Sequence, residues 1–176
     1  MYVWFWLGWE DQSVPDNIEF IKTFKERVMD CELQYWANEM RTVQKLRSYC
    51  LFKEERIEEV YLTLDIPRRF KVCLARFRTG SHNFQIEIGR HNNIPHEDRI
   101  CEFCWLNSGS RFIEDEFHVL FQCSVYDEIR GWYLKKHYSS ANEYAFKSIM
   151  KSDDKLCIID VANFIVNVFK MRKDMM

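Results

Sequence analysis

The sequence predicts a mainly α-helical fold built from three consecutive segments. Three observations support this prediction: apolar residues recur at steps of three and four, only three prolines and five glycines interrupt the 176 residues, and 47% of the residues are hydrophobic. Such a composition is typical of a chain that buries a core. We expect an N-terminal helical region (1–65), a central region (66–138) and a segment with a last helix (139–176), packed as one domain.

The N-terminal region is predicted to hold two helices. Residues 14–17 (VPDN) place capping side chains ahead of an apolar stripe, which is typical of a helix start. The stripe advances in steps of three and four along one helix face: Ile18, Ile21, Phe24, Val28, Cys31 and Tyr35. A second helix is expected over 41–52, with three inward side chains: Val43, Leu46 and Cys50.

The central region is predicted to begin with a basic helix. Pro67 suits the first turn of a helix, and Gly80 suits its end. The apolar positions of this helix are Phe70, Leu74 and Phe77, and its basic residues lie on other faces: Arg68, Arg69, Lys71, Arg76 and Arg78. Residues 83–89 alternate apolar and polar side chains, so a short β segment is predicted there, with a helix as the alternative.

Three further helices are predicted downstream. The first, over 113–122, begins with three acidic residues, which suit the positive end of a helix dipole. The second covers 126–138. The last, over 156–171, is apolar on most sides and is therefore expected to be mostly buried or partnered.

The apolar start of the chain does not predict a membrane protein. MYVWFWLGW is far shorter than the ~20 residues of a spanning helix, and it lacks the basic start and the cleavage site of a signal peptide. We therefore expect an intracellular protein, nuclear or cytoplasmic, with no membrane partner. Seven cysteines in such a compartment favour metal ligands or buried thiols over disulfides.

Four side chains that can ligate a metal follow the spacing C-x2-C-x13-H-x4-C: Cys101, Cys104, His118 and Cys123. Two close pairs separated by a loop are typical of a tetrahedral zinc site, and four protein ligands leave no open position for catalysis. The sequence therefore predicts a structural Zn²⁺ that staples a small module of the helical domain. The bound ion is expected to supply part of the folding energy.

Helix geometry constrains the second ligand pair. Residues five apart are rotated by ~140° on an α-helix, so His118 and Cys123 cannot both face the metal along one continuous helix. We expect the helix to end near Gln122, with Cys123 approaching from its end. Asp115, three residues before His118, is a candidate acceptor for the second imidazole N–H. The alternative for Asp115 is a solvated charge at the helix start.

Other interpretations of these cysteines stay open. Cys101 and Cys104 can form a redox pair, although no thioredoxin-like pattern surrounds them. The cysteines can also be inert core residues beside an incidental histidine, and a catalytic Cys–His pair lacks an orienting third residue. Cys73 and His82 are alternative ligands, or else a core cysteine and a surface histidine. The remaining cysteines are predicted to lie in the core: Cys31, Cys50 and Cys157.

Charge along the middle of the chain is polarised. Seven basic and three acidic residues lie between Ile66 and Arg99, whereas six acidic residues and one basic residue lie between Cys101 and Glu128. The net charge of −2 does not by itself indicate a nucleic-acid-binding protein. The basic residues can contact phosphates, or they can form an ordinary solvated surface. These candidate contacts are Arg68, Arg69, Lys71, Arg76, Arg78, Arg90 and Arg99.

Trp105 directly follows the first cysteine pair. Its ring can stack on an unpaired base, or it can pack against the metal module. The sequence leaves this choice open.

The run G-R-x(8)-R-x-C-x-x-C, followed by E-D-E-x-H-x(4)-C, occupies residues 89–123. It resembles the C-terminal tail of non-LTR retrotransposon reverse transcriptases. Looser matches extend the resemblance over nearly the whole chain, and they include Phe20, Phe24, Arg27, Trp36, Phe52, Tyr126, Arg130, Phe169 and Arg172. The loop between the two ligand pairs is longer than in retroviral zinc knuckles, so knuckle-style base stacking is not implied.

The resemblance implies a zinc-stabilised tail that follows a polymerase domain and positions RNA or DNA without catalysing. Neither the aspartate pair of the polymerase nor an endonuclease is recognisable, so the chain is not expected to be an enzyme. We expect a truncated copy, a fragment or a reused piece of such an element. The alternative is a zinc-stabilised protein-interaction module that docks on a polymerase or another partner through apolar surfaces.

Overall fold

The computed structural model describes residues 17–175, and the apolar N-terminus with the predicted capping residues 14–16 lies outside them. The mainly α-helical prediction is confirmed. The described residues contain no β-strand, only one isolated antiparallel bridge between Ile100 and Ile113. None of their helices is long and apolar enough to cross a membrane. The chain divides into two compact units between Thr42 and Val43, and segments 66–138 and 139–176 both lie in the second unit.

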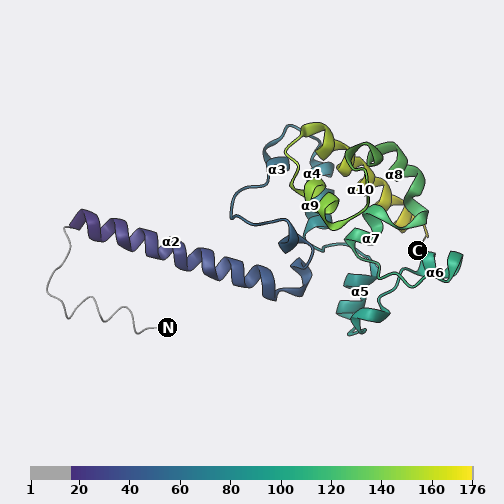
Figure 1. Cartoon of the computed structure of the whole chain (residues 1–176), viewed down its shortest axis with the longest axis horizontal. Helices are drawn as coiled ribbons and strands as arrows, with labels where there is room; N and C mark the ends of the chain where they lie inside the picture. Colours follow the sequence, from purple (N-terminus) through teal and green to yellow (C-terminus); the bar gives the residue numbers. More distant parts are fainter. Residues whose placement is uncertain (1–16, 176) are drawn as a thin grey trace. The chain divides into compact units, whose positions relative to one another are not determined.

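The described part of the first unit is one long helix, α2 (Asn17–Thr42) (Figure 1). The predicted apolar stripe lies on this helix, and its side chains are exposed: Ile18, Ile21, Phe24, Val28 and Tyr35. Cys31 is exposed as well, so its predicted core position is wrong.

The second unit is a set of helices, most of them short, around one apolar core (Figure 1). In chain order they are α3 (Val60–Thr63), α4 (Arg68–Arg78), α5 (Gln85–His91), α6 (Glu102–Ser108), α7 (Glu116–Phe121), α8 (Asp127–Tyr133), α9 (Glu143–Lys151) and α10 (Lys155–Met175). Short 3₁₀ turns lie at 44–46, 49–51, 96–98, 124–126 and 135–137. The long helix α10 is central, because α4, α8 and α9 all pack against it.

The core is built from the predicted inward faces of α4 and α10. Phe70, Leu74 and Phe77 are buried along α4, as their helical spacing predicted. Helix α10 confirms the predicted last helix and extends it at both ends, and four of its buried side chains are Val161, Phe164, Ile165 and Val168. Burying each such side chain stabilises the fold by about 1.5–3 kcal/mol. The packing of α4 against α10 therefore contributes much of the stability of the second unit.

Two predicted elements are wrong. Residues 83–89 do not form a strand; the helix given as the alternative forms instead, since Phe84 is the extended residue before α5 and the residues from Gln85 onward are helical. Glu87, expected on a polar strand face, is buried between Arg47 and Arg90. The predicted helix over 41–52 is replaced by two 3₁₀ turns after an extended Val43. Tertiary bonds fix this conformation, since Ser48 Oγ donates to a carboxylate oxygen of Glu116 at 2.6 Å.

The helices predicted over 113–122 and 126–138 form over shorter ranges. Ile113 belongs to the bridge with Ile100, so α7 begins only at Glu116. The second helix is α8, flanked by 3₁₀ turns on both sides. The shortened α7 contains His118, and Cys123 follows two residues after its end.

Gly80 and Gly109 provide a matched test of a backbone contact. Both adopt positive φ angles, 63° and 67°. A Cβ on Gly80 would lie 2.5 Å from the backbone oxygen of Lys45, whereas a Cβ on Gly109 would meet nothing within 4 Å. We expect Gly109→Ala to lower the free energy of unfolding by about 1–2 kcal/mol, the cost of the left-handed conformation. Gly80→Ala should cost clearly more, and urea denaturation of both variants checks the difference. Equal losses would show that the segment around Lys45 moves aside freely.

Candidate metal centre

The four predicted ligands come together as one buried cluster. The ligating atoms of Cys101, Cys104, His118 and Cys123 all lie within 4.8 Å of one another. The Sγ atom of Cys123 lies 3.8 Å from that of Cys101 and 3.9 Å from that of Cys104. His118 directs its Nε2 to within 3.4 Å of the Cys104 Sγ. The cluster can therefore hold a metal ion.

These distances fit a tetrahedral ion. With sulfur ligands about 2.3 Å from the metal, a regular tetrahedron places the sulfur atoms about 3.8 Å apart. The separations of the Cys123 Sγ from those of Cys101 and Cys104, 3.8 and 3.9 Å, are close to that value. Four protein side chains fill a four-coordinate shell, which is the arrangement of structural rather than catalytic sites.

The thiols compete for protons in the absence of a cation. A hydrogen bond from Cys123 lowers the pKa of Cys101 to about 4, although burial opposes this shift. The same hydrogen bond raises the pKa of Cys123, and burial together with the Cys101 charge raises that of Cys104. One thiolate thus discourages the ionisation of its two neighbours. A divalent cation allows all three thiols to ionise together, because metal binding stabilises the thiolates and releases their protons.

The first ligand pair lies at the start of α6. Cys101 precedes the helix, and its backbone N–H donates to the carbonyl of Phe112 at 2.8 Å beside the Ile100–Ile113 bridge. Cys104 is in the first turn of α6 and buried. The ring of Phe112 in turn stacks on the His118 ring, with centroids 5.2 Å apart. One short antiparallel contact therefore holds the two halves of the centre together.

The second ligand pair flanks the end of α7. His118 lies in the helix, Phe121 is its last residue, Gln122 is the C-cap, and Cys123 follows outside it. The prediction that the helix ends near Gln122 is confirmed. Asp115 caps the start of α7, since its carboxylate accepts a hydrogen bond from the His118 backbone N–H at 2.7 Å. Its predicted contact with the imidazole is not formed, and the ring Nδ1 faces Gln122 Oε1 at 3.4 Å instead.

The acidic residues beside Asp115 anchor α7 to distant parts of the second unit. Glu114 is buried, and it pairs with both terminal nitrogens of Arg172 in α10. Its carboxylate also accepts from the backbone N–H of Gln85 at 2.7 Å. Burial raises the pKa of Glu114 to about 7, and Arg172 opposes that shift. Arg172 Nε donates to the Asn83 carbonyl, so one guanidinium joins three segments of the chain.

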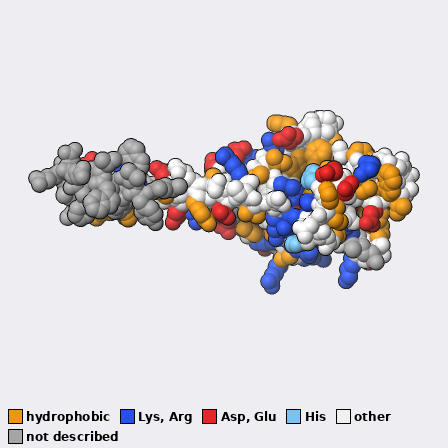
Figure 2. Space-filling view, turned by 90° about the horizontal axis from the view of Figure 1, so that it is seen from below, with side chains coloured by type: hydrophobic (Ala, Val, Ile, Leu, Met, Phe, Trp, Pro, Cys, Tyr) orange, Lys and Arg blue, Asp and Glu red, His pale blue; other side chains and the backbone are white. Residues whose placement is uncertain are grey.

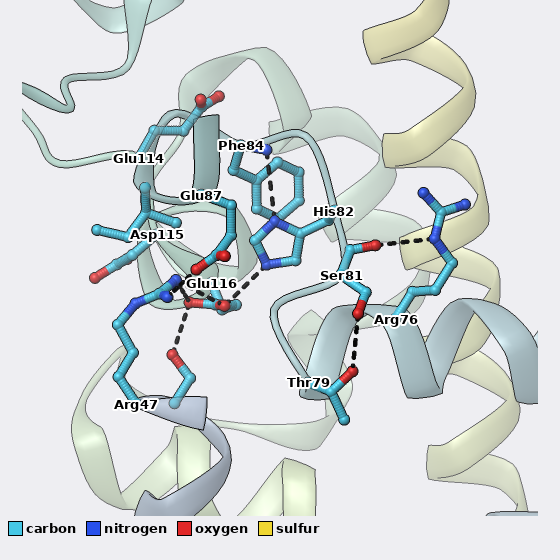
Figure 3. Close-up of polar contacts among 12 residues, drawn as sticks. Arg47, Arg76, Thr79, Ser81, His82, Phe84, Glu87, Glu114, Asp115 and Glu116 are labelled. Atoms are coloured by element: carbon cyan, nitrogen blue, oxygen red, sulfur yellow. Dashed lines mark hydrogen bonds and ion pairs between the residues drawn. The ribbon is translucent and has the colours of Figure 1, made fainter. Parts of the chain in front are cut away.

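Glu116 makes a second buried network on the other side of α7 (Figure 3). Arg47 donates to both of its carboxylate oxygens, at 2.8 and 2.9 Å, and also pairs with Glu87. His82 lies against the same carboxylate, with its Nε2 2.8 Å from Oε1. Burial would raise the pKa of Glu116, but the hydrogen bond and charge of His82, with Arg47, hold it below its usual range. His82 is therefore engaged with Glu116 and is not a member of the metal cluster.

Comparison with known proteins adds no family assignment. No family model, no curated protein and no solved structure matches this chain.

The remaining cysteines lie outside the cluster. Cys157 is buried, which confirms its predicted core position, and Cys50 is half-buried. Cys73 is half-buried on α4 near Arg69 and Arg76, and burial raises the pKa of its thiol.

The structure separates the candidate phosphate contacts into two groups. Arg68, Arg69 and Arg76 are exposed on α4, whereas Arg78 is buried with Glu59 as its ion-pair partner. Arg90 is half-buried and pairs with Glu87. Two further candidates are half-buried and bind backbone carbonyls: Lys71 to Leu62, and Arg99 to Ile86 and Ile94. Lys and Arg side chains gather on one face of the second unit (Figure 2).

Trp105 remains partly accessible beside the metal cluster. Its side chain is 46% exposed, and the neighbouring Leu106 is more exposed still, at 79%. Phe112, next to the bridge residue Ile113, is 42% exposed. The metal module therefore presents apolar side chains to solvent instead of covering all of them.

Proposed function

We propose that the second unit is a zinc-stabilised module that binds RNA or DNA without catalysing a reaction. Zinc is the metal that best suits three thiolates and one imidazole in a closed tetrahedron. The proposal agrees with the resemblance of the sequence to the tail of non-LTR retrotransposon reverse transcriptases. In this proposal the metal stabilises the fold, and the arginines contact the nucleic acid.

The observation that carries this proposal is that some arginines are paired with carboxylates, whereas others are exposed. Most buried or half-buried arginines have a carboxylate partner: Arg47, Arg78, Arg90, Arg130 and Arg172. Arg68, Arg69 and Arg76 are exposed, and among residues 17–175 no carboxylate lies within ion-pair distance of them. Three exposed guanidinium groups without a carboxylate partner among the described residues are suited to phosphate contacts, which dominate non-specific nucleic-acid affinity. Of the three, Arg76 also donates from its Nε to the Ser81 carbonyl at 2.9 Å.

The burial of acidic residues also favours binding on this unit. Sequence charge suggested an acidic metal module, yet Glu114 and Glu116 are each 1% exposed and are paired with arginines. Much of the negative charge counted between 101 and 128 is therefore compensated inside the protein. Trp105 is then a candidate to stack on an unpaired base near the module.

The test is salt-dependent binding to a fluorescent oligonucleotide. Each phosphate contact contributes a slope of about −0.7 to −0.9 in log affinity against log salt. We therefore expect Arg68→Ala/Arg69→Ala/Arg76→Ala to weaken binding at low salt and to make the slope shallower by about two to three units. RNA and DNA single strands and duplexes of one sequence should be compared in parallel.

The control removes the same charge elsewhere on the second unit. Lys135, Lys155 and Lys173 are exposed, and their triple alanine variant should bind nearly as well as the parent protein. Equal weakening by both triple variants would show that binding depends on the net charge and not on the positions of these arginines. Absence of binding by the unaltered protein at low salt would refute the proposal.

A second candidate function is protein docking. The observation in its favour is the exposed apolar stripe of α2, in which Ile21 and Phe24 are 50% and 46% exposed. Exposed apolar patches of this kind mark interaction surfaces. Binding of a polymerase or another partner through this stripe should change little with salt, which distinguishes it from phosphate binding.

A further inference from the structure

Cys123 reaches the metal cluster only because the chain reverses direction at the end of α7. The backbone N–H groups of Gln122 and Cys123 both donate to the His118 carbonyl at 2.8 Å. This double contact closes the helix and swings Cys123 toward the side that His118 faces. Ending a helix so abruptly leaves carbonyl groups of its last turn without intrahelical donors. Inside a protein each such group needs a partner.

Arg130 supplies these partners. Its Nε donates to the Leu120 carbonyl at 2.8 Å, and its terminal NH2 nitrogen donates to the Cys123 carbonyl at 2.8 Å. The same nitrogen lies 3.3 Å from the Val119 carbonyl. The guanidinium thus binds carbonyl groups on both sides of the chain reversal, one of them belonging to a metal ligand. None of the predicted site residues makes this contact.

The environment of Arg130 makes the contact rigid. The residue is 2% exposed, and its remaining terminal nitrogen pairs with Asp127 in the first turn of α8. A guanidinium presents five donors in a fixed planar fork, whereas a lysine ammonium is a compact charge on a flexible stem. Only arginine can therefore bind these separate carbonyls and the carboxylate at once from within α8.

We propose that Arg130 is a positioning residue of the metal centre, which holds the reversal at Gln122 so that Cys123 is delivered as the fourth ligand. This inference rests on the metal-binding part of the proposed function and is independent of nucleic-acid binding. Residues that orient metal ligands typically change metal affinity by 10–100-fold when replaced. Arg130 does so through the backbone of Cys123, without touching the metal.

The experiment compares two buried arginines in the full chain. Arg130→Ala removes the guanidinium at Cys123, and Arg78→Ala removes a guanidinium that is similarly buried, paired with Glu59 and bonded to the Met150 carbonyl. Zinc affinity is measured by competition with a chromophoric chelator. Cobalt(II) is then substituted, because its thiolate charge-transfer absorption reports how many cysteines are bound.

We expect Arg130→Ala to raise the zinc Kd by about 10–100-fold and to reduce the cobalt–thiolate absorption toward that of Cys123→Ser. Arg78→Ala should leave both the Kd and the spectrum close to those of the unaltered protein. If either alanine variant fails to fold, Arg130→Lys and Arg78→Lys carry the same comparison. Because lysine retains the charge but not the fork, only Arg130→Lys should then weaken zinc binding.

Two results would overturn the inference. Arg130 variants with unchanged zinc affinity and an unchanged cobalt spectrum would show that Cys123 needs no such support. Equal losses in the Arg130 and Arg78 variants would reduce the effect to general destabilisation. Failure of the unaltered protein to bind either ion would refute the metal proposal itself, and loss of oligonucleotide binding alone would leave the Arg130 inference intact.

Discussion

Cys123→Ser is expected to abolish stoichiometric zinc binding and to remove most of the stability that the ion supplies. The sulfur of Cys123 lies within 4 Å of two other cysteine sulfurs, at 3.8 and 3.9 Å, so its loss opens the tetrahedron. A ligand held at about a thousand times its Kd stabilises the folded state by about 4 kcal/mol. The variant should lose about that amount under such conditions. Elemental analysis and urea denaturation with and without added zinc measure the two effects.

Cys73→Ser is the matched control, because Cys73 is a half-buried cysteine outside the cluster. It should retain one zinc ion per chain and respond to added zinc as the unaltered protein does. A chelator should reduce the stability of the control and leave that of Cys123→Ser nearly unchanged. Retention of a full equivalent of zinc by Cys123→Ser would contradict the four-ligand site.

Arg172→Ala is expected to lower the free energy of unfolding by about 3–5 kcal/mol, the usual cost of removing one member of a buried ion pair. The two partners are nearly inaccessible, with Arg172 at 4% exposure and Glu114 at 1%. The variant also leaves the Asn83 carbonyl without the donor that Arg172 provides. Lys173→Ala, at the exposed neighbouring position, should change the stability by less than about 0.5 kcal/mol.

The loss in Arg172→Ala should grow as the pH rises. Burial already raises the pKa of Glu114 to about 7, and removing Arg172 removes a charge that opposes this shift. A carboxyl whose pKa is higher in the folded than in the unfolded state binds its proton more tightly when folded. Its favourable contribution is complete below the unfolded pKa and disappears as the pH rises through the folded one. Urea denaturation at pH 5 and pH 8 tests this sign.

The partner substitution provides the control for the charge argument. Adding Glu114→Gln to Arg172→Ala removes the stranded carboxylate, so the double variant should regain part of the lost stability at pH 8 and show a flatter pH dependence. A double variant with the same pH dependence as Arg172→Ala would show that Glu114 is not the titrating group.

The ligand set and the two longest core helices of the second unit could be predicted from the sequence, because ligand spacing and apolar periodicity are local signals. Cys101, Cys104, His118 and Cys123 follow a spacing that their chemistry dictates, and α4 and α10 show their inward faces directly. The partners of the charged residues could not be predicted in this way. Nothing local to Glu116 shows that Arg47 will neutralise it from 69 positions away.

The same limitation explains the errors in secondary structure. The alternation over 83–89 fits a strand pattern only if its polar positions face solvent, but Glu87 is buried and paired with Arg47 and Arg90. The helix predicted over 41–52 had a suitable stripe, yet bonds from Arg47 and Ser48 to Glu116 hold that segment in turns.

The anchoring of the metal module also sets an order of assembly. The outermost metal ligands are separated by only 22 positions, whereas the Glu114–Arg172 pair spans 58 positions and closes only when the end of α10 arrives. Short loops close at less entropic cost than long ones, and a chain leaving the ribosome exposes its earlier residues first. A metal ion can thus bind the cluster while α10 is still being synthesised. The metal-bound module then presents the Glu114 carboxylate, and the pairing of Arg172 with this carboxylate becomes the step that completes the fold.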